Sequence, residues 1–148
     1  MKTIPLWING QAVESKSGRS GDVFDPALGE VSATVGFANQ AEINQTIAAA
    51  AAAFPAWRDQ SLTKRIQIMF KFRELLEAKK GELAEIITSE HGKVLSDAMG
   101  EITRGQEVVE FACGMPQLLK GEYSENASTN VDVYSMKQPL GVVGIISP

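Results

Sequence analysis

Arg104 is the residue of this 148-residue chain whose position most directly suggests chemistry. At 100° per residue it falls within an apolar stripe of a helix expected over residues 94–119. Three interpretations stay open. The guanidinium can reach solvent along its aliphatic stem, pair with Glu101 or Glu107, or bind a ligand carboxylate through two parallel hydrogen bonds. The stripe consists of Val108, Phe111 and Met115.

Cys113 and His91 are the residues that could act as a nucleophile and a base. Cys113 lies on the other apolar stripe of the same helix, where a free cysteine behaves as a small hydrophobic residue. His91 ends a helical pattern before Gly92, and the spacing fixes no carboxylate or nucleophile beside it. We expect neither to be catalytic. With one cysteine and one histidine, we also expect no disulfide and no metal site.

The last eleven residues, 138–148, contain an unbroken apolar run with two glycines. Such a run is typical of a strand that is buried on both faces in a parallel α/β sheet. Ligands of doubly wound sheets bind outside the carboxyl ends of the strands, so Ser147 is predicted to lie next to a cofactor. An uncovered strand of this kind would expose several hundred Å² of apolar surface, so we expect the isolated chain to self-associate.

Two β-hairpins are predicted before the first helix. Asn9-Gly10 joins two short strands and is typical of a type I′ turn, which needs two positive φ angles. A turn at residues 26–29 joins the second pair of strands. The four predicted strands cover residues 6–8, 11–13, 22–25 and 30–38.

Helices are predicted to fill most of the chain between the hairpins and residue 120. Asn39 and Glu42 form a capping box for the first, and Pro55 is expected to end it at Phe54. Pro116 is expected to kink or end the last. The predicted helices run from 40 to 54, from Ser61 or Thr63 to Gly81, from there to His91, and from 94 to 119. A polar loop over 120–130 and a projecting strand over 131–136 follow.

Composition favours an ordinary globular chain, with 44% hydrophobic and 22% charged residues. A net charge of −4 without a basic run argues against a nucleic-acid surface. No stretch approaches the roughly 20 apolar residues of a membrane helix, and no targeting leader is visible, so a cytoplasmic location is expected.

Several motifs resemble the N-terminal third of the aldehyde dehydrogenase superfamily. They are Leu6-Trp-Ile-Asn-Gly10, Phe24-Asp-Pro26, Phe54-Pro-Ala-Trp57, Ser89-Glu-His-Gly-Lys93, Gly100-Glu101 and residues 138–145. Three further segments are similar to the CoA-acylating methylmalonate-semialdehyde dehydrogenases of that superfamily. These are residues 101–105, 108–114 and 118–125.

The resemblance implies an α/β fold, the N-terminal part of a Rossmann-like subunit. Residues 1–120 would supply hairpins and helices of the NAD-binding domain, 121–138 an oligomerisation arm, and 139–148 the first strand of the cofactor sheet. It also implies that Ser147 contacts NAD and that Arg104 helps to hold the substrate carboxylate. The complete protein would be a homo-oligomer, a tetramer.

The family reaction begins with attack of a cysteine thiolate on an aldehyde, followed by hydride transfer to NAD. In the resembling branch the acyl group passes to coenzyme A, with loss of carbon dioxide from malonate or methylmalonate semialdehyde. Cys113 does not match the nucleophile's motif, so we expect no turnover from this chain alone. The alternatives are a dehydrogenase for another acidic semialdehyde, such as succinate semialdehyde, or a non-catalytic domain that binds a nucleotide or a protein.

Overall fold

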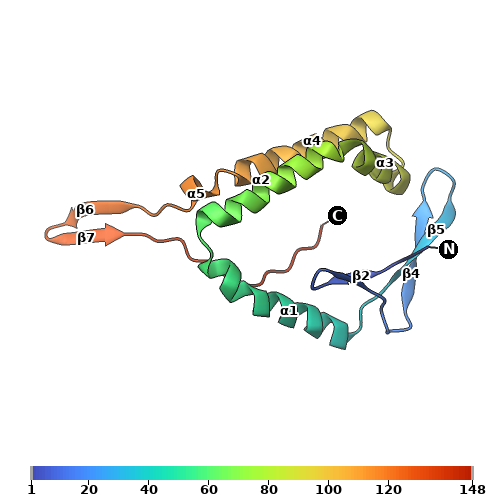
Figure 1. Cartoon of the computed structure of the whole chain (residues 1–148), viewed down its shortest axis with the longest axis horizontal. Coiled ribbons are helices and arrows are strands. Elements are labelled where there is room, and N and C mark those ends of the chain that lie inside the picture. The colour runs from blue at the N-terminus through green and yellow to red at the C-terminus, as the bar shows by residue number, and fades with distance from the viewer. Residues whose placement is uncertain (1, 148) are drawn as a thin grey trace.

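The computed structural model describes residues 2–147, which form two layers of helix joined by small sheets (Figure 1). The strands are β1 (Lys2–Ile4), β2 (Leu6–Ile8), β3 (Gln11–Val13), β4 (Ser20–Asp25), β5 (Glu30–Gly36), β6 (Tyr123–Ser128) and β7 (Val131–Tyr134). The helices are α1 (Gln40–Asp59), α2 (Leu62–Ala78), α3 (Lys80–His91), α4 (Leu95–Ala112) and α5 (Met115–Leu118).

Both predicted hairpins are confirmed. Strands β2 and β3 pair antiparallel around Asn9 and Gly10, whose φ angles of 51° and 75° are the positive values that the turn requires. Strands β4 and β5 form the second hairpin. Strand β1, which the sequence did not reveal, pairs parallel with β5, so the sheet has the order β1-β5-β4.

The capping box at the start of α1 is also confirmed. The Asn39 side chain accepts a hydrogen bond from the Glu42 backbone N–H at 2.9 Å, and the Glu42 carboxylate accepts from the Asn39 N–H at 2.8 Å. The same carboxylate accepts from the Lys16 N–H at 2.6 Å and from the Ser15 hydroxyl at 3.0 Å. Glu42 therefore ties the loop before β4 to the first turn of α1.

The predicted end of α1 at Phe54 is wrong, because the helix continues through Pro55 to Asp59. Proline removes only its own N–H from the hydrogen-bond ladder, and here that loss falls in the last turns of a 20-residue helix. Helix α2 then begins at an N-cap, Ser61, whose hydroxyl accepts from the Lys64 N–H.

Helices α2, α3 and α4 pack together as one layer, with the small core between α3 and α4. Ala84 and Ala98 are completely buried there beside Ile102, and their small side chains let the two helices approach closely. Arg73 of α2 donates to Glu110 of α4 at 2.8 Å. Gly92 ends α3 in the left-handed conformation, with φ of 81°, as predicted.

Helix α4 ends at Ala112, and a short turn, α5, follows with Pro116 near its start. Proline suits the first turn of a helix because its missing N–H has no partner there. The break predicted at Pro116 is therefore confirmed, and the single helix predicted to residue 119 divides in two.

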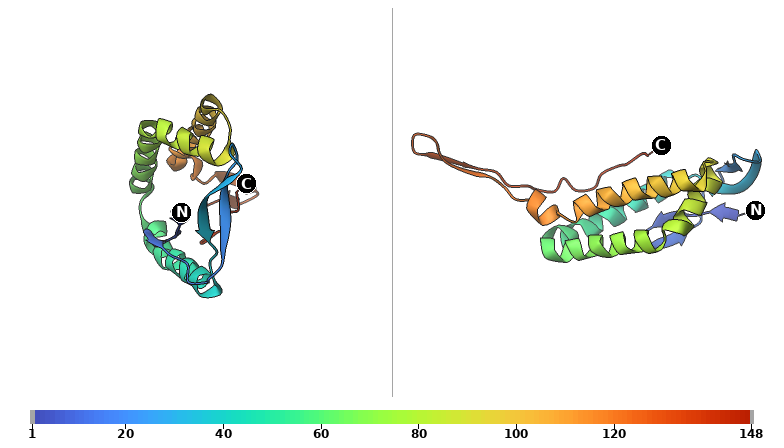
Figure 2. Two further views of the ribbon diagram at one scale, coloured as in Figure 1. Left: turned by 90° about the vertical axis from the view of Figure 1, so that its right-hand side faces the viewer. Right: turned by 90° about the horizontal axis from the view of Figure 1, so that it is seen from above.

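The chain then leaves the body as the hairpin β6–β7, which projects beyond all the helices (Figures 1 and 2). The projecting strand predicted over 131–136 is confirmed as β7, but the loop predicted over 120–130 is wrong for residues 123–128, which form β6. Both strands are exposed throughout, so β6 lacks the apolar face by which strands are recognised. Asp132 holds the hairpin by accepting from the Tyr123 hydroxyl and the Asn126 N–H.

Gly121, at the base of this hairpin, is expected to tolerate no side chain. A Cβ there would overlap the backbone carbonyl oxygen of Ser135. Gly121→Ala should therefore push the backbone segments at Gly121 and Ser135 apart, at a cost in stability of about 1–3 kcal/mol. The check is hydrogen exchange at the Ser135 amide, which donates to the Glu122 carbonyl at 2.8 Å and should lose its protection. Gly144→Ala, where a Cβ meets open space, is the matched control and should leave that protection unchanged.

The strand predicted over residues 140–146 does not form in this structure. The segment is extended but unpaired, and Leu140, Ile145 and Ile146 are almost fully exposed. A strand needs a neighbour to complete its hydrogen bonds, and the three sheets of the described residues place no strand beside this segment. Residues 141–143 lie against α1, and the segment runs along one side of the helices (Figure 2, right).

The exposed segment over residues 140–146 supports the prediction that the isolated chain self-associates. Several large apolar side chains of residues 140–146 face solvent together, which monomeric proteins rarely tolerate. Sedimentation velocity of the purified chain should show concentration-dependent species larger than its 15.9 kDa monomer. A variant with Leu140, Ile145 and Ile146 replaced by serine should sediment more slowly at the same concentration, and equal behaviour of both would contradict the prediction.

Candidate functional site

Arg104 lies on α4 with its guanidinium turned back toward the start of the helix. Its Nη2 donates to Glu101 Oε1 at 3.1 Å, and a Cβ built on Gly100 would lie 3.7 Å from its Nη1. The side chain is 64% exposed. Of the three interpretations of this arginine, the structure shows pairing with Glu101, and the exposed donors leave room for a ligand as well.

The apolar stripe around Arg104 is not covered by a second layer in the described residues. Val108 and Phe111 are both exposed, whereas Ile102 and Ala98 on the other stripe face α3. Of the two apolar stripes that the sequence indicated on this helix, only the one facing α3 is packed within residues 2–147.

Lys93 connects the turn before α4 to the first two turns of that helix. Its ammonium donates to Asp97 Oδ2 and to Glu101 Oε1, both at 2.8 Å, and its side chain is only 14% exposed. These bonds raise the pKa of Lys93, whereas the Lys93 ammonium lowers the pKa values of Asp97 and Glu101. All of these groups are therefore held in their charged forms near neutral pH.

Sequence reasoning missed Lys93 as part of this arrangement. The available signal was its spacing, because Lys93, Asp97 and Glu101 recur every four residues and so share one helical face. Glu101 had been considered only as a partner of Arg104. The structure shows it to be shared between the two cations.

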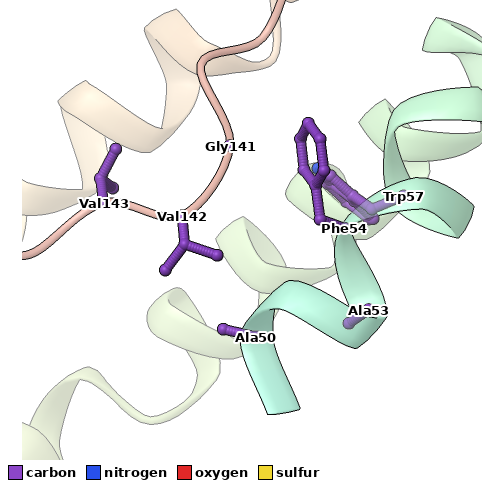
Figure 3. Close-up of a pocket in the computed structure, with 7 residues that line it drawn as sticks. All are labelled: Ala50, Ala53, Phe54, Trp57, Gly141, Val142 and Val143. Atoms are coloured by element: carbon purple, nitrogen blue, oxygen red, sulfur yellow. The ribbon is translucent and has the colours of Figure 1, made fainter. Parts of the chain in front are cut away.

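Ser147, the predicted cofactor contact, lies exposed at the end of the unpaired terminal segment. Earlier in that segment Val142 and Val143 line a hollow of about 370 Å³ against α1 (Figure 3). Val142 points toward the α1 surface around Ala50, while Val143 points away from it (Figure 3). The hollow is lined by apolar residues and glycine, so it offers no charged group to a ligand.

Cys113 and His91 are not brought together. Cys113 is half-buried at the C-cap of α4, and His91 is exposed in the last turn of α3, near the other end of α4. The 18 residues of α4 span about 27 Å, so the two side chains cannot form a nucleophile–base pair. No cluster of three or more metal-ligating side chains occurs among residues 2–147. Within the same residues, every helix is too short or too polar to cross a membrane.

Known proteins resemble this chain along its whole length. Malonate-semialdehyde dehydrogenase of Pseudomonas aeruginosa is 47% identical over 148 residues, which is 100% of this chain and 30% of that protein. The acylating mitochondrial methylmalonate-semialdehyde dehydrogenase of Arabidopsis thaliana is 46% identical over 145 residues, 98% of this chain and 24% of that protein. The chain thus spans at most about 30% of the length of these relatives.

Solved structures share the fold. A protein of Sinorhizobium meliloti, crystallised with NAD and described as a methylmalonate-semialdehyde dehydrogenase, matches with a TM-score of 0.89 and 41% identity. The match covers 95% of this chain and 29% of that one. Methylmalonate-semialdehyde dehydrogenase of Oceanimonas doudoroffii gives a TM-score of 0.88 and 47% identity over 95% of this chain and 28% of its own. The predicted α/β fold class is confirmed by these matches.

The family model that matches is described as the aldehyde dehydrogenase family, and it covers residues 12–148. That range includes both the helix that carries Arg104 and the terminal segment that carries Ser147. The match agrees with the motifs recognised in the sequence and spans far more than half of the chain. The chain belongs to the aldehyde dehydrogenase family.

Proposed function

We propose that this chain serves as the N-terminal part of an NAD-dependent, CoA-acylating malonate- or methylmalonate-semialdehyde dehydrogenase. The observation that carries the proposal is the identity of 40–47% to proteins named for these two substrates in bacteria, plants and animals. In each case the match extends over at least 98% of the chain. Similarity to other aldehyde dehydrogenases of known structure is lower, at 25–32%.

Arg104 is assigned to the substrate carboxylate that malonate and methylmalonate semialdehydes share. A guanidinium binds a carboxylate through two parallel, charge-assisted hydrogen bonds. The structure supports this role in that Arg104 is 64% exposed and donates to Glu101 through Nη2. Its Nε and Nη1 donors have no partner among the described residues, and one of them can form two parallel bonds to a second carboxylate together with the other N–H of Nη2.

Ser147 is assigned to the binding of NAD, which would accept the hydride when bound. Coenzyme A is the proposed acyl acceptor. The exposed Ser147 hydroxyl has the hydrogen-bonding capacity that a cofactor contact needs. Residues 139–148 would become the first strand of the cofactor sheet once a neighbouring strand pairs with them. Residues 1–120 would form the N-terminal part of the NAD-binding domain.

Residues 121–138 are proposed as the arm of a homo-oligomer, a tetramer in the complete subunit. The projecting β6–β7 hairpin fits this role because its backbone edges are free to pair with another subunit. A cytoplasmic location stays a prediction, since the names of the Arabidopsis and human relatives place those proteins in mitochondria.

A chimera tests the proposed function. Residues 1–148 would replace the segment that they match in the Pseudomonas aeruginosa malonate-semialdehyde dehydrogenase. With malonate semialdehyde, NAD and CoA we expect NADH and acetyl-CoA to form in equal amounts, at a rate within about tenfold of the parent enzyme. The isolated chain, assayed in parallel, should form no NADH.

The outcome that would contradict the proposal is a folded chimera that binds NAD but does not oxidise malonate or methylmalonate semialdehyde. Turnover of succinate semialdehyde under the same conditions would then favour a dehydrogenase for another acidic aldehyde. Chimera folding is checked first by gel filtration and by quenching of tryptophan fluorescence on addition of NAD.

A further inference from the structure

Glu101 uses one carboxylate oxygen to accept from two cations. Its Oε1 accepts from Lys93 Nζ at 2.8 Å and from Arg104 Nη2 at 3.1 Å. The contact with Arg104 is therefore a single hydrogen bond to a shared atom, not the two parallel bonds of a full arginine–carboxylate pair. Glu101 holds the guanidinium in place without occupying it.

Lys93 is the fixed member of the group. Its side chain is 14% exposed, against 45% for Glu101 and 64% for Arg104. It also bonds to Asp97, one turn before Glu101 on the same helical face. The left-handed turn at Gly92 ends α3 just before Lys93 and so sets the path of the chain at this point.

We propose that Lys93 and Glu101 are positioning residues for Arg104 at the site of the substrate carboxylate. Lys93 fixes Glu101, and Glu101 holds the guanidinium back over Gly100 through one N–H of Nη2. The other N–H of Nη2, together with Nε or Nη1, remains available for two parallel bonds to the substrate carboxylate. This inference rests on the proposed function of Arg104.

The charges explain why Lys93 matters to an anionic substrate. Lys93 and Arg104 balance Asp97 and Glu101, so the group is neutral as a whole. Without Lys93 two carboxylates face one guanidinium, and the excess negative charge opposes a second anion. Glu101 is then also free to turn both oxygens toward Arg104 and compete with the substrate.

The test compares Lys93→Met with Asp97→Asn in the chimera. Lys93→Met is expected to raise KM for malonate semialdehyde about five- to tenfold with kcat nearly unchanged, because only binding of the carboxylate is weakened. The neutral aldehyde propanal should show no change, and Lys93→Arg should restore most of the binding. Asp97 contacts Lys93 but not Arg104, so Asp97→Asn should change KM less than about twofold.

A double-mutant cycle separates this inference from the proposed function. In an Arg104→Leu background, Lys93→Met should have no further effect on KM for malonate semialdehyde, because the residue that it positions is gone. An equal effect in both backgrounds, or equal effects on malonate semialdehyde and propanal, would overturn the positioning role. If Arg104→Leu itself has no effect, the carboxylate role of Arg104 fails instead. Should Lys93→Met not fold, Lys93→Gln removes the same positive charge and should also raise KM for malonate semialdehyde.

Discussion

Arg104→Leu in the chimera is expected to lower kcat/KM for malonate semialdehyde by roughly 100-fold. Leucine keeps much of the aliphatic bulk of the side chain but cannot donate to the substrate carboxylate, and hydrogen bonds to charged groups are among the strongest in proteins. Steady-state rates of NADH formation over a range of aldehyde concentrations measure the change. Because Arg104 is exposed and packs little, the variant should fold and bind NAD as the unchanged chimera does.

Two controls, a neutral aldehyde and an Arg104→Lys variant, show whether Arg104 binds the substrate carboxylate. Propanal, which has no carboxylate, should be oxidised at an unchanged rate, and Arg104→Lys should fall between the two, because an ammonium cannot make two parallel bonds. Equal losses for malonate semialdehyde and propanal would show that Arg104 supports the structure of the site and does not bind the carboxylate.

Glu42→Ala is expected to be the most destabilising of the polar substitutions in the N-terminal part of the chain. The Glu42 residue is only 7% exposed and its carboxylate accepts three hydrogen bonds, from Ser15, Lys16 and Asn39. Its removal leaves partly buried donors unpaired and separates the loop before β4 from the helix. Asn39→Ala, which removes only the cap, should cost about 1 kcal/mol and is the matched comparison.

Urea denaturation of the chimera and its variants measures both effects. The free energy of unfolding should fall more for Glu42→Ala than for Asn39→Ala. The opposite order would show that the cap matters and the cross-links to Ser15 and Lys16 do not.

The same carboxylate gives the stability a defined pH dependence. Hydrogen bonds from the backbone N–H groups of Lys16 and Asn39 lower the pKa of Glu42 below its ordinary value of 4.5. A lowered pKa means that the stabilisation is fully present above pH 4.5 and is lost as the pH falls through the folded-state pKa. Glu42→Gln, which cannot ionise, should show a flatter pH dependence in that acidic range.

Local signals in the sequence were sufficient where the residues concerned are neighbours. The Asn9-Gly10 turn, the Asn39–Glu42 capping box and the left-handed Gly92 each depend on the geometry of a few consecutive residues, and all three form as predicted. Helix α1 passes through Pro55 because one lost hydrogen bond near its end is offset by the rest of a long helix.

Predictions that depend on residues distant in the sequence were less successful. Residues 140–146 have the composition of a buried strand, yet without a strand beside them they stay extended and exposed. The family assignment survives this, because it rests on a match over residues 12–148 and not on that one element. Strand β6 was missed for the opposite reason, since its partner β7 is present but neither strand has a buried face.

Arg104 shows how far periodicity can go toward a site. It identified a cation in an apolar stripe and left its partner open, and the role in carboxylate binding came only from family resemblance. The spacing of Lys93, Asp97 and Glu101 indicated a shared helical face, but the contacts of the Lys93 ammonium also depend on the bend of the chain between α3 and α4.

The parallel pairing of β1 with β5 has a consequence for the order of folding. Lys2 pairs with Ala33, so during synthesis β1 must wait for a strand made some thirty positions later. Meanwhile the β2–β3 hairpin needs only its own short turn and can close within microseconds. We therefore expect β1 to pair with β5 last in this part of the molecule, after both hairpins have formed.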